Sequence, residues 1–330
     1  MDKPYVIGID IGGTNTEFGA VNSQGEIILR GGIGPKFKSG ATESGKYETV
    51  EAYLAELIPE LNIIIEQLGG KEKFNGIGAG APDGNYYKGT IEHAVNIAWA
   101  KGSVIPFAAM VKDATGIPVV LTNDANAAAV GEMIYGVAKG MRDFIMITLG
   151  TGVGSGIVVN GQVVYGHDGF AGELGHVIIK KENGRLCGCG RKGCLEAYAS
   201  APGVAATARE YVKNGGQETI LSGMKLEDIT SEEVYKAAVK GDKLAVNILR
   251  DTGLLLGEAF ADFVAFSSPE AIILFGGLAK SKKFILKPIE DAMEAHLLGI
   301  YKGKTKILVS ELPESDAAVL GASALAWDFK

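Results

Sequence analysis

The sequence predicts an α/β protein of two domains, and three observations lead to this. Short apolar strands alternate with helical segments, which is typical of α/β folds. The chain has 330 residues, 47% of them hydrophobic, enough to bury two cores. A group of glycine-punctuated strands near the N-terminus returns roughly 140 residues later. We therefore expect two related halves, with chance reuse of glycine-rich hairpins as the alternative.

The two strand groups have the same composition. Each is a run of apolar segments separated by glycine turns, as in a β-meander. The segments are Tyr5–Asp10, Phe18–Val21 and Glu26–Arg30 in the first group, and Phe144–Leu149, Gly156–Val159 and Gln162–Tyr165 in the second.

Helices and strands alternate through the rest of the chain. We expect helices at 46–68, 197–213, 231–239, 243–266 and 316–327, and strands at 77–81, 119–122 and 271–275. No segment reads as a Pro-rich or Ser-rich linker, so the domain boundary is expected where the chain crosses near residues 122–125. Residues 1–122 with about 312–330 would form a small N-terminal lobe, and residues 123–311 a larger C-terminal lobe.

Charge and hydropathy narrow the classes of partner. The net charge of −7 is spread over mixed Lys and Glu runs, which argues against nucleic acid or an anionic membrane. The chain starts without a signal-peptide pattern, and the long uncharged stretch at 144–166 is cut by glycines, so we expect a cytoplasmic protein without a membrane span. A small neutral substrate fits this composition.

Two glycine turns are candidate phosphate sites. Gly12, Gly13 and Thr14 follow a strand, so their backbone N–H groups and one hydroxyl can approach phosphate oxygens. Asp10 at the strand end could hold Mg²⁺ through water, or it could simply form the turn.

The second turn has the sequence LGTGVGSG at residues 149–156 and offers Gly150, Thr151 and Gly152. Alone it is weak evidence, but its pairing with the first turn favours two phosphate hairpins. There is no P-loop motif, and neither turn opens a helix as a dinucleotide fingerprint does. Gly276 and Gly277 end a later strand and could let an adenosine approach the backbone, although they could equally start a helix.

All three cysteines lie in one short segment, which is no disulfide framework for a chain of this size. With His176, the thiols of Cys187, Cys189 and Cys194 match a closed tetrahedral Zn²⁺ site, whereas free thiols are the alternative. Four protein ligands leave no position for water, so the zinc would be structural and a zinc hydrolase is disfavoured.

Two glutamates flank this cluster. The zinc would tie Glu173 and Glu196 into one rigid unit that can accept hydrogen bonds from sugar hydroxyls. Each could instead be a solvated surface charge.

A candidate base follows the strand at 119–122. Asn123 and Asp124 stand where that strand gives way to an Ala-rich helix. A carboxylate there can accept the proton of a hydroxyl that attacks the γ-phosphate of ATP. The alternative is that either residue only caps the helix.

Together these motifs resemble the ROK family of sugar kinases and sugar-responsive repressors over nearly the whole chain. The matching segments are DIGGT at 10–14, NDANAAA at 123–129, LGTGVGSGI at 149–157, ELGH at 173–176 and CGCGRKGCLEAYAS at 187–200. The resemblance implies the two-domain actin-like ATPase fold of hexokinase type, which is ribonuclease H-like, with a cleft between its lobes. It also implies ATP-dependent phosphorylation of a hexose hydroxyl at C6, with glucose or an N-acetylated amino sugar as substrate, and a homodimer.

The same resemblance assigns roles to residues. Asp124 would be the catalytic base, and the glycines of both turns and Gly276 would line the nucleotide. The sugar contacts would be Asn123, Asp124, Glu173, His176, Glu196 and Asn96, and the zinc ligands would be His176, Cys187, Cys189 and Cys194. The chain departs from the family's Gly-x-Pro-Gly turn at Asp83, which leaves sugar specificity open there.

Two other functions compete with a kinase. A sugar-binding sensor without turnover would keep the zinc loop but could lose Asp124 or Asp10, and both are present. A repressor would need a DNA-binding helix-turn-helix before Tyr5, where only a few residues precede the first strand.

Overall fold

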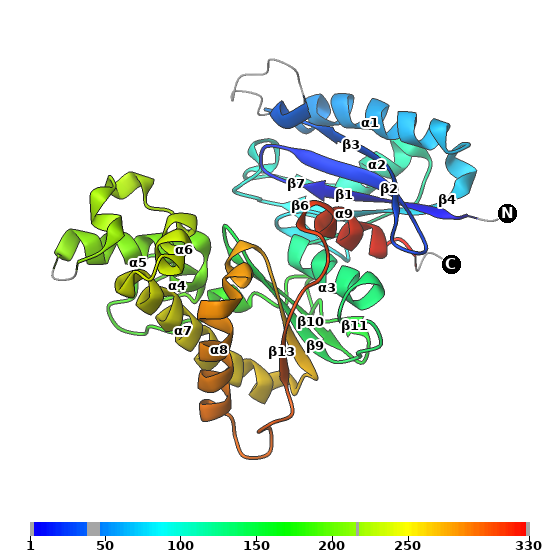
Figure 1. Cartoon of the computed structure of the whole chain (residues 1–330). Helices are drawn as coiled ribbons and strands as arrows, with labels where there is room; N and C mark the ends of the chain where they lie inside the picture. Colours follow the sequence, from blue (N-terminus) through cyan, green and yellow to red (C-terminus); the bar gives the residue numbers. More distant parts are fainter. Residues whose placement is uncertain (1–2, 38–46, 216–217, 328–330) are drawn as a thin grey trace. The chain divides into compact units, whose positions relative to one another are not determined.

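The structure is a computed structural model that describes residues 3–37, 47–215 and 218–327 (Figure 1). It consists of two compact units. Unit 1 comprises Met1–Gly140, Val163–Gly172 and Glu311–Lys330, and unit 2 comprises Met141–Gln162 and Glu173–Ser310. This division differs from the predicted lobes, because the helix that follows residue 123 packs on the sheet of unit 1 and on the last helix.

Unit 1 is built on a five-stranded sheet in the order β3-β2-β1-β4-β8. The first three strands form the predicted antiparallel meander: β1 (Tyr5–Ile11), β2 (Thr16–Asn22) and β3 (Ile27–Ile33). Next to β1, β4 (Phe74–Gly80) and β8 (Val119–Thr122) run parallel to it.

Unit 2 repeats this topology in a sheet of order β11-β10-β9-β12-β13. Its meander consists of β9 (Phe144–Leu149), β10 (Val153–Val159) and β11 (Gln162–Val163). The parallel strands β12 (Ala271–Phe275) and β13 (Lys306–Val309) follow next to β9. The matching strand orders confirm the prediction of two related halves and of the α/β class.

Strand β1 shows how the sequence builds the layers of unit 1. Side chains alternate between the faces of a strand, so Ile7, Ile9 and Ile11 share one face, where they join the core formed with α1 (Val50–Gln67) and α2 (Phe107–Thr115). Figure 1 shows these two helices against the same face of the sheet.

The opposite face of this sheet is covered by α9 (Glu314–Ala324), whose Val319 and Leu320 pack on Val6. The helix lies very close to the strands: a Cβ added to Gly78 would lie 1.9 Å from the carbonyl oxygen of Ala322. Only glycine fits at this contact. The last helix of the chain thus packs directly on the sheet that contains the first strand, β1.

The remaining elements place the functional residues. The other helices are α3 (Asp124–Tyr135), α4 (Glu196–Ala199), α5 (Ala201–Asn214), α6 (Ser231–Val239), α7 (Lys243–Ser267) and α8 (Lys282–His296). A small sheet contains β5 (Gly84–Asn85), β6 (Thr90–Glu92) and β7 (Val104–Ile105). Single-turn helices are η1 (Pro35–Phe37), η2 (Lys71–Lys73), η3 (Ala98–Ala100), η4 (Leu174–His176), η5 (Ile220–Gly223), η6 (Leu226–Asp228) and η7 (Gly277–Ser281).

Three predicted elements need correction. The single helix expected at 197–213 is broken into α4 and α5 at Ser200, whose hydroxyl accepts a hydrogen bond from the Gly203 amide (3.1 Å) and so starts a new helix. The strand expected at 162–165 ends at Val163, because the chain turns there into unit 1. The predicted helix at 46–68 begins at Val50, after the cap Thr49, and residue 46 lies outside the described residues.

In the described parts of the chain no helix is apolar over a length that would span a bilayer.

Candidate active site

The first glycine turn lies between β1 and β2, where the Gly12 amide donates to the Asn15 carbonyl (3.0 Å). Asp10 is the last residue but one of β1 and is half-buried. The backbone of Asn96 lies directly on this turn, since a Cβ added to Gly13 would be 2.4 Å from the Asn96 carbonyl oxygen. The fold thus brings Asn96 to the first turn, although it lies 82 positions after Thr14 in the chain (96 − 14).

Asn123 and Asp124 stand at the start of α3, and the structure separates their roles. The side chain of Asn123 caps the helix by accepting a hydrogen bond from the Asn126 amide (2.7 Å). Asp124 accepts from the adjacent Ala125 amide (2.8 Å) and lies in the first turn, where the helix dipole favours a negative charge. Since Asn123 supplies the cap, Asp124 is available for chemistry.

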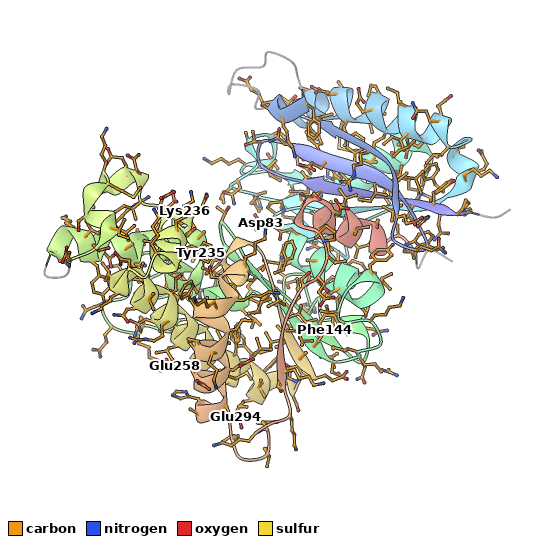
Figure 2. The ribbon with its side chains drawn as sticks, in the orientation of Figure 1. Asp83, Phe144, Tyr235, Lys236, Glu258 and Glu294 are labelled. Carbon is orange, nitrogen blue, oxygen red and sulfur yellow. The ribbon has the colours of Figure 1, made fainter. Side chains whose placement is uncertain are left out.

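The end of β4 and the turn after it lie beside Asp124. A Cβ added to Gly80 would be 3.7 Å from the Cα of Asp124. The following turn is closed by the Gly84 amide, which donates to the Ala81 carbonyl (3.1 Å). Asp83, labelled in Figure 2, occupies the left-handed position of this turn with φ of 54°. Glycine would take that position without strain, and aspartate tolerates it better than most residues.

Desolvation by surrounding protein atoms is the main cause that raises the pKa of Asp124, although the residue itself is exposed to solvent. The hydrogen bond from Ala125 opposes this rise, and the charge of Asp83 adds to it. Burial also raises the pKa of Asp10 to about 7, with further contributions from Asp124 and Glu17. A cation bound among these groups would relieve their mutual repulsion.

The second glycine turn lies in unit 2, where the Gly150 amide donates to the Gly152 carbonyl (3.0 Å). Glu196 packs against it: a Cβ added to Gly152 would be 2.6 Å from Glu196 Oε2, and the same oxygen accepts from the Val153 amide (3.0 Å). The other oxygen, Oε1, lies 3.4 Å from the sulfur of Cys187. Glu196 therefore connects the glycine turn to the cysteine cluster, a link that the sequence alone did not predict.

Gly276 joins the same region from the end of β12. Its φ is 104°, and an added Cβ would lie 2.5 Å from the carbonyl oxygen of Leu149, the residue before the second turn. Nothing lies within 4 Å of the Cβ that Gly277 would carry, and η7 starts there. Thr151 is exposed at the tip of the turn. The candidate nucleotide residues of unit 2 are thus neighbours.

His176, Cys187, Cys189 and Cys194 form a compact ligand set, with all their ligand atoms within 4.8 Å of one another. The Cys187 sulfur lies 3.7 Å from His176 Nδ1, and the sulfurs of Cys189 and Cys194 are also 3.7 Å apart. A tetrahedral zinc with bonds of about 2.3 Å to sulfur and about 2.0 Å to nitrogen separates its ligands by about 3.6 to 3.8 Å. The measured spacings fit such an ion.

Arg191 adjusts the charge of this cluster. Burial acts to raise the pKa of Cys189, but hydrogen bonds from the backbone and side chain of Arg191 outweigh it and lower that pKa. Arg191 also donates to the carbonyl of His176 (2.6 Å). A thiolate is the form that binds a metal, so this arginine favours metal binding.

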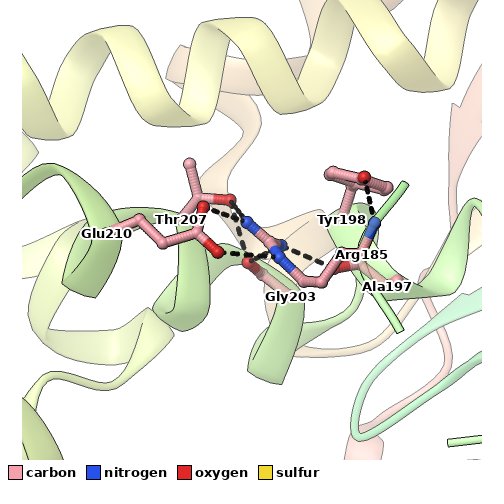
Figure 3. Close-up of polar contacts among 6 residues, drawn as sticks. All are labelled: Arg185, Ala197, Tyr198, Gly203, Thr207 and Glu210. Carbon is pink, nitrogen blue, oxygen red and sulfur yellow. Dashed lines mark hydrogen bonds and ion pairs between the residues drawn. The ribbon is translucent and has the colours of Figure 1, made fainter. Parts of the chain in front are cut away.

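A second arginine anchors the loop between the ligands, as Figure 3 shows. The Arg185 guanidinium donates to the carbonyls of Ala197 (2.6 Å) and Gly203 (3.1 Å) and pairs with Glu210 through two hydrogen bonds (2.8 and 3.2 Å). Its backbone amide donates to the Tyr198 hydroxyl (2.7 Å). Arg185 thereby fastens the cysteine loop to α4 and α5. No motif marked it in the sequence.

Glu173 immediately precedes η4, which carries His176. The His176 amide donates to the Glu173 carbonyl (3.1 Å), and the Leu174 amide donates to the Ser155 hydroxyl on β10 (3.0 Å). Glu173, the cysteine–histidine cluster and Glu196 thus lie on one scaffold in unit 2. Asp10, the first turn, Asn96, Asn123 and Asp124 lie in unit 1.

Comparison with known proteins identifies the family. Residues 6–328 match the profile of the ROK family. A glucokinase of Halalkalibacterium halodurans is 34% identical over 331 residues, which is 98% of this chain and 96% of that protein. A putative xylose repressor of a Caldicellulosiruptor species is 28% identical over 97% of this chain and 77% of its own.

A solved structure gives the same result. The ROK family glucokinase from Streptomyces griseus, in complex with glucose and AMPPNP, superimposes with a TM-score of 0.76 at 30% identity, over 97% of this chain and 98% of that one. The fold is therefore that of the ROK sugar kinases, and this chain belongs to the ROK family.

Proposed function

We propose that this protein is an ATP-dependent sugar kinase that transfers the γ-phosphoryl group of ATP to the C6 hydroxyl of glucose or of an N-acetylated amino sugar. The observation that carries the proposal is the state of Asp124: it starts α3 without serving as the cap, and its pKa is raised. A raised pKa brings a carboxylate closer to the working range of a general base. Full-length similarity to glucokinases supports the same activity.

In the proposed reaction Asp124 accepts the proton of the sugar hydroxyl while the hydroxyl oxygen attacks the γ-phosphorus. The bond between that phosphorus and the β–γ bridging oxygen breaks, so the products are a sugar phosphate, ADP and a proton held on Asp124. The reaction needs little covalent chemistry from the protein, and positioning and charge stabilisation account for most of the acceleration.

The nucleotide and its Mg²⁺ are assigned to the glycine turns. Backbone amides at Gly13 and Thr14 in unit 1, and at Thr151 and Gly152 in unit 2, are the candidate phosphate donors. The amides of Gly12 and Gly150 close the two turns, so these glycines would let the phosphates approach the backbone. Asp10 would hold Mg²⁺ through water, and the bound cation would lower the raised pKa of this carboxyl by favouring its ionised form. Gly276 and Gly277 would let the adenosine approach the backbone.

Zinc is assigned to His176, Cys187, Cys189 and Cys194, and when bound it would supply a rigid four-ligand joint without an open position. The chain's own groups then orient the sugar site. Glu196 is held by the Val153 amide, and Glu173 is held through the backbone of η4. These carboxylates, with Asn123, Asn96 and His176, are the proposed acceptors and donors for sugar hydroxyls.

The test is ADP release from Mg·ATP across glucose, N-acetylglucosamine, N-acetylmannosamine, mannose, allose and fructose. We expect one or two of these sugars to raise ADP release well above the sugar-free rate. The 6-deoxy form of the accepted sugar is the matched control: it should bind without turnover if C6 is the acceptor. If no sugar raises ADP release but one binds in calorimetry, the protein is a sugar-binding sensor instead.

The homodimer is proposed from the family resemblance, the lack of nucleic-acid binding from the mixed charge pattern, and the cytoplasmic location from full-length similarity to glucokinases. We infer a cytoplasmic homodimer that does not bind nucleic acid. Light scattering on the purified protein tests the dimer, and a single mass equal to one chain would exclude it.

A further inference from the structure

One short segment of the chain changes units twice. Residues Val163–Gly172, here called the strap, belong to unit 1, whereas the residues directly before and after them belong to unit 2. The strap leads straight into Glu173, one of the proposed sugar contacts. The contacts that hold the strap to unit 1 therefore also restrain the backbone position of Glu173, which follows it directly.

Two tyrosines that follow β5 hold the first part of the strap. The ring of Tyr165 stacks on that of Tyr86 in a nearly parallel arrangement, with centroids 3.9 Å apart and an interplanar angle of 4°. The neighbouring Tyr87 packs edge-on against Tyr165 and donates from its hydroxyl to the carbonyl of Gly166 (2.9 Å). Tyr86 and Tyr87 remain partly exposed.

A buried amide holds the second part of the strap. Asn85 is completely buried and donates from Nδ2 to the carbonyl of Asp168 (2.7 Å). Its Oδ1 accepts from the amides of Tyr87 and Lys88. A Cβ added to Gly169 would lie only 2.7 Å from this oxygen, so the strap is seated closely on the buried amide.

The contacts of the strap also extend to the strand end that precedes Asp124, the proposed base. Burial raises the pKa of Tyr165, and an interaction of its hydroxyl with the side chain of Thr122 partly offsets the rise. Thr122 is completely buried at the end of β8, two residues before Asp124. β5 rests on the same strand end, because a Cβ added to Gly84 would lie 2.4 Å from the Thr122 carbonyl oxygen.

We propose that Tyr165 is a positioning residue for the sugar site. By its contacts with Tyr86 and Thr122 it would fix the strap that leads to Glu173 against the strand end that leads to Asp124. The inference rests on the proposed kinase function for its activity readout. Its physical basis is that a misplacement of about 1 Å at reacting groups lowers the rate by up to about 100-fold. Tyr165 touches neither substrate nor ATP in this proposal and acts through the two chain segments.

The experiment compares Tyr165→Leu, Tyr165→Phe and the matched control Tyr5→Leu. Tyr5 is also a half-buried tyrosine in an aromatic pair of unit 1, with Phe74 at 5.8 Å, but it begins β1, whereas Asp10 stands near the other end of that strand. We expect Tyr165→Leu to lower kcat/KM for the sugar at least about tenfold, while KM for ATP changes less than about twofold. Tyr165→Phe keeps the stack but loses the hydroxyl's interaction with Thr122, so its kcat/KM should lie between those of the wild type and Tyr165→Leu. Tyr5→Leu should leave both constants near wild type.

Hydrogen exchange of the ligand-free proteins provides a readout that does not depend on kinase activity. We expect Tyr165→Leu, but not Tyr5→Leu, to accelerate exchange at residues 122–126 and 173–176. Equal exchange and equal kinetics in the two leucine variants would overturn the proposal. The proposal would also be overturned if Tyr165→Leu changed kcat/KM for the sugar and KM for ATP by the same factor. If the wild type phosphorylates no sugar, the proposed function fails, and the exchange comparison still decides whether Tyr165 positions these segments.

Discussion

The contact between the second glycine turn and Glu196 permits a sharp prediction for Gly152→Ala. The added Cβ would lie 2.6 Å from Glu196 Oε2, and an ordinary van der Waals contact starts at 3.4 Å, so the carboxylate must retreat by about 0.8 Å. The glycine has ordinary backbone angles, because it is absent from the residues with positive φ, so the substitution changes the contact and not the turn.

The retreat has a definite energetic consequence. Glu196 Oε2 accepts the Val153 amide at 3.0 Å, and a displacement of this size breaks or badly stretches that bond. Hydrogen bonds to charged groups contribute about 1.5 to 3 kcal/mol. If Glu196 orients the sugar, we expect sugar affinity to fall by about ten- to a hundredfold, since 1.4 kcal/mol corresponds to about a factor of ten.

Calorimetric titration of the accepted sugar without ATP measures this effect. Gly150→Ala is the matched control, because nothing lies within 4 Å of its added Cβ, and its sugar affinity should equal that of the wild type. A Gly152→Ala protein that binds sugar as tightly as Gly150→Ala would refute the role of Glu196 in the sugar site.

Three other predictions concern the cysteine loop and the base. Arg185→Ala should lower the free energy of unfolding in urea by about 2 to 4 kcal/mol, because it leaves the carbonyls of Ala197 and Gly203 without their donor. Glu210→Ala removes only the largely exposed partner of Arg185 and should cost less than about 1 kcal/mol. Equal costs would contradict this. Asp124 must be ionised to act as a base, so its raised pKa should place the acid limb of the pH profile of kcat/KM above the ordinary aspartate value of about 3.9. Asp83→Asn removes a negative charge near Asp124 and should move that limb to lower pH. A limb that is unchanged or moves upward would exclude the interaction. Removal of zinc with a chelator, or Cys189→Ser, should weaken sugar binding while the protein stays folded. Unchanged sugar affinity in the metal-free protein would show that the metal does not organise the sugar site.

Much of the fold follows from patterns that local sequence encodes. The strands Phe144–Leu149 and Ala271–Phe275 and the helix Ser231–Val239 have the predicted bounds, because apolar runs or helical periodicity end there at glycine or at a cap. The clustering of His176, Cys187, Cys189 and Cys194 was also predictable. Three cysteines and a histidine in one segment have few structural uses other than a metal.

Other features depend on contacts that sequence spacing does not report. Ser200 breaks a continuous helical pattern because its hydroxyl caps α5, and the small β5–β7 sheet has strands of only two or three residues. Arg185 and the Tyr86–Tyr165 stack join segments distant in the chain without any motif. The boundary between the units was placed too early, because α3 packs on α9 and β4 of unit 1.

The most direct test of the account is transfer of the labelled γ-phosphoryl group from ATP to the accepted sugar by wild type, Asp124→Asn and the control Asp113→Asn. Asp113 is an exposed carboxylate on α2 of the same unit. General base catalysis contributes about 10²- to 10⁴-fold, so Asp124→Asn should lose that much turnover and still bind the sugar, while Asp113→Asn should match the wild type. Near-normal phosphoryl transfer by Asp124→Asn would contradict the central claim that this carboxylate is the base.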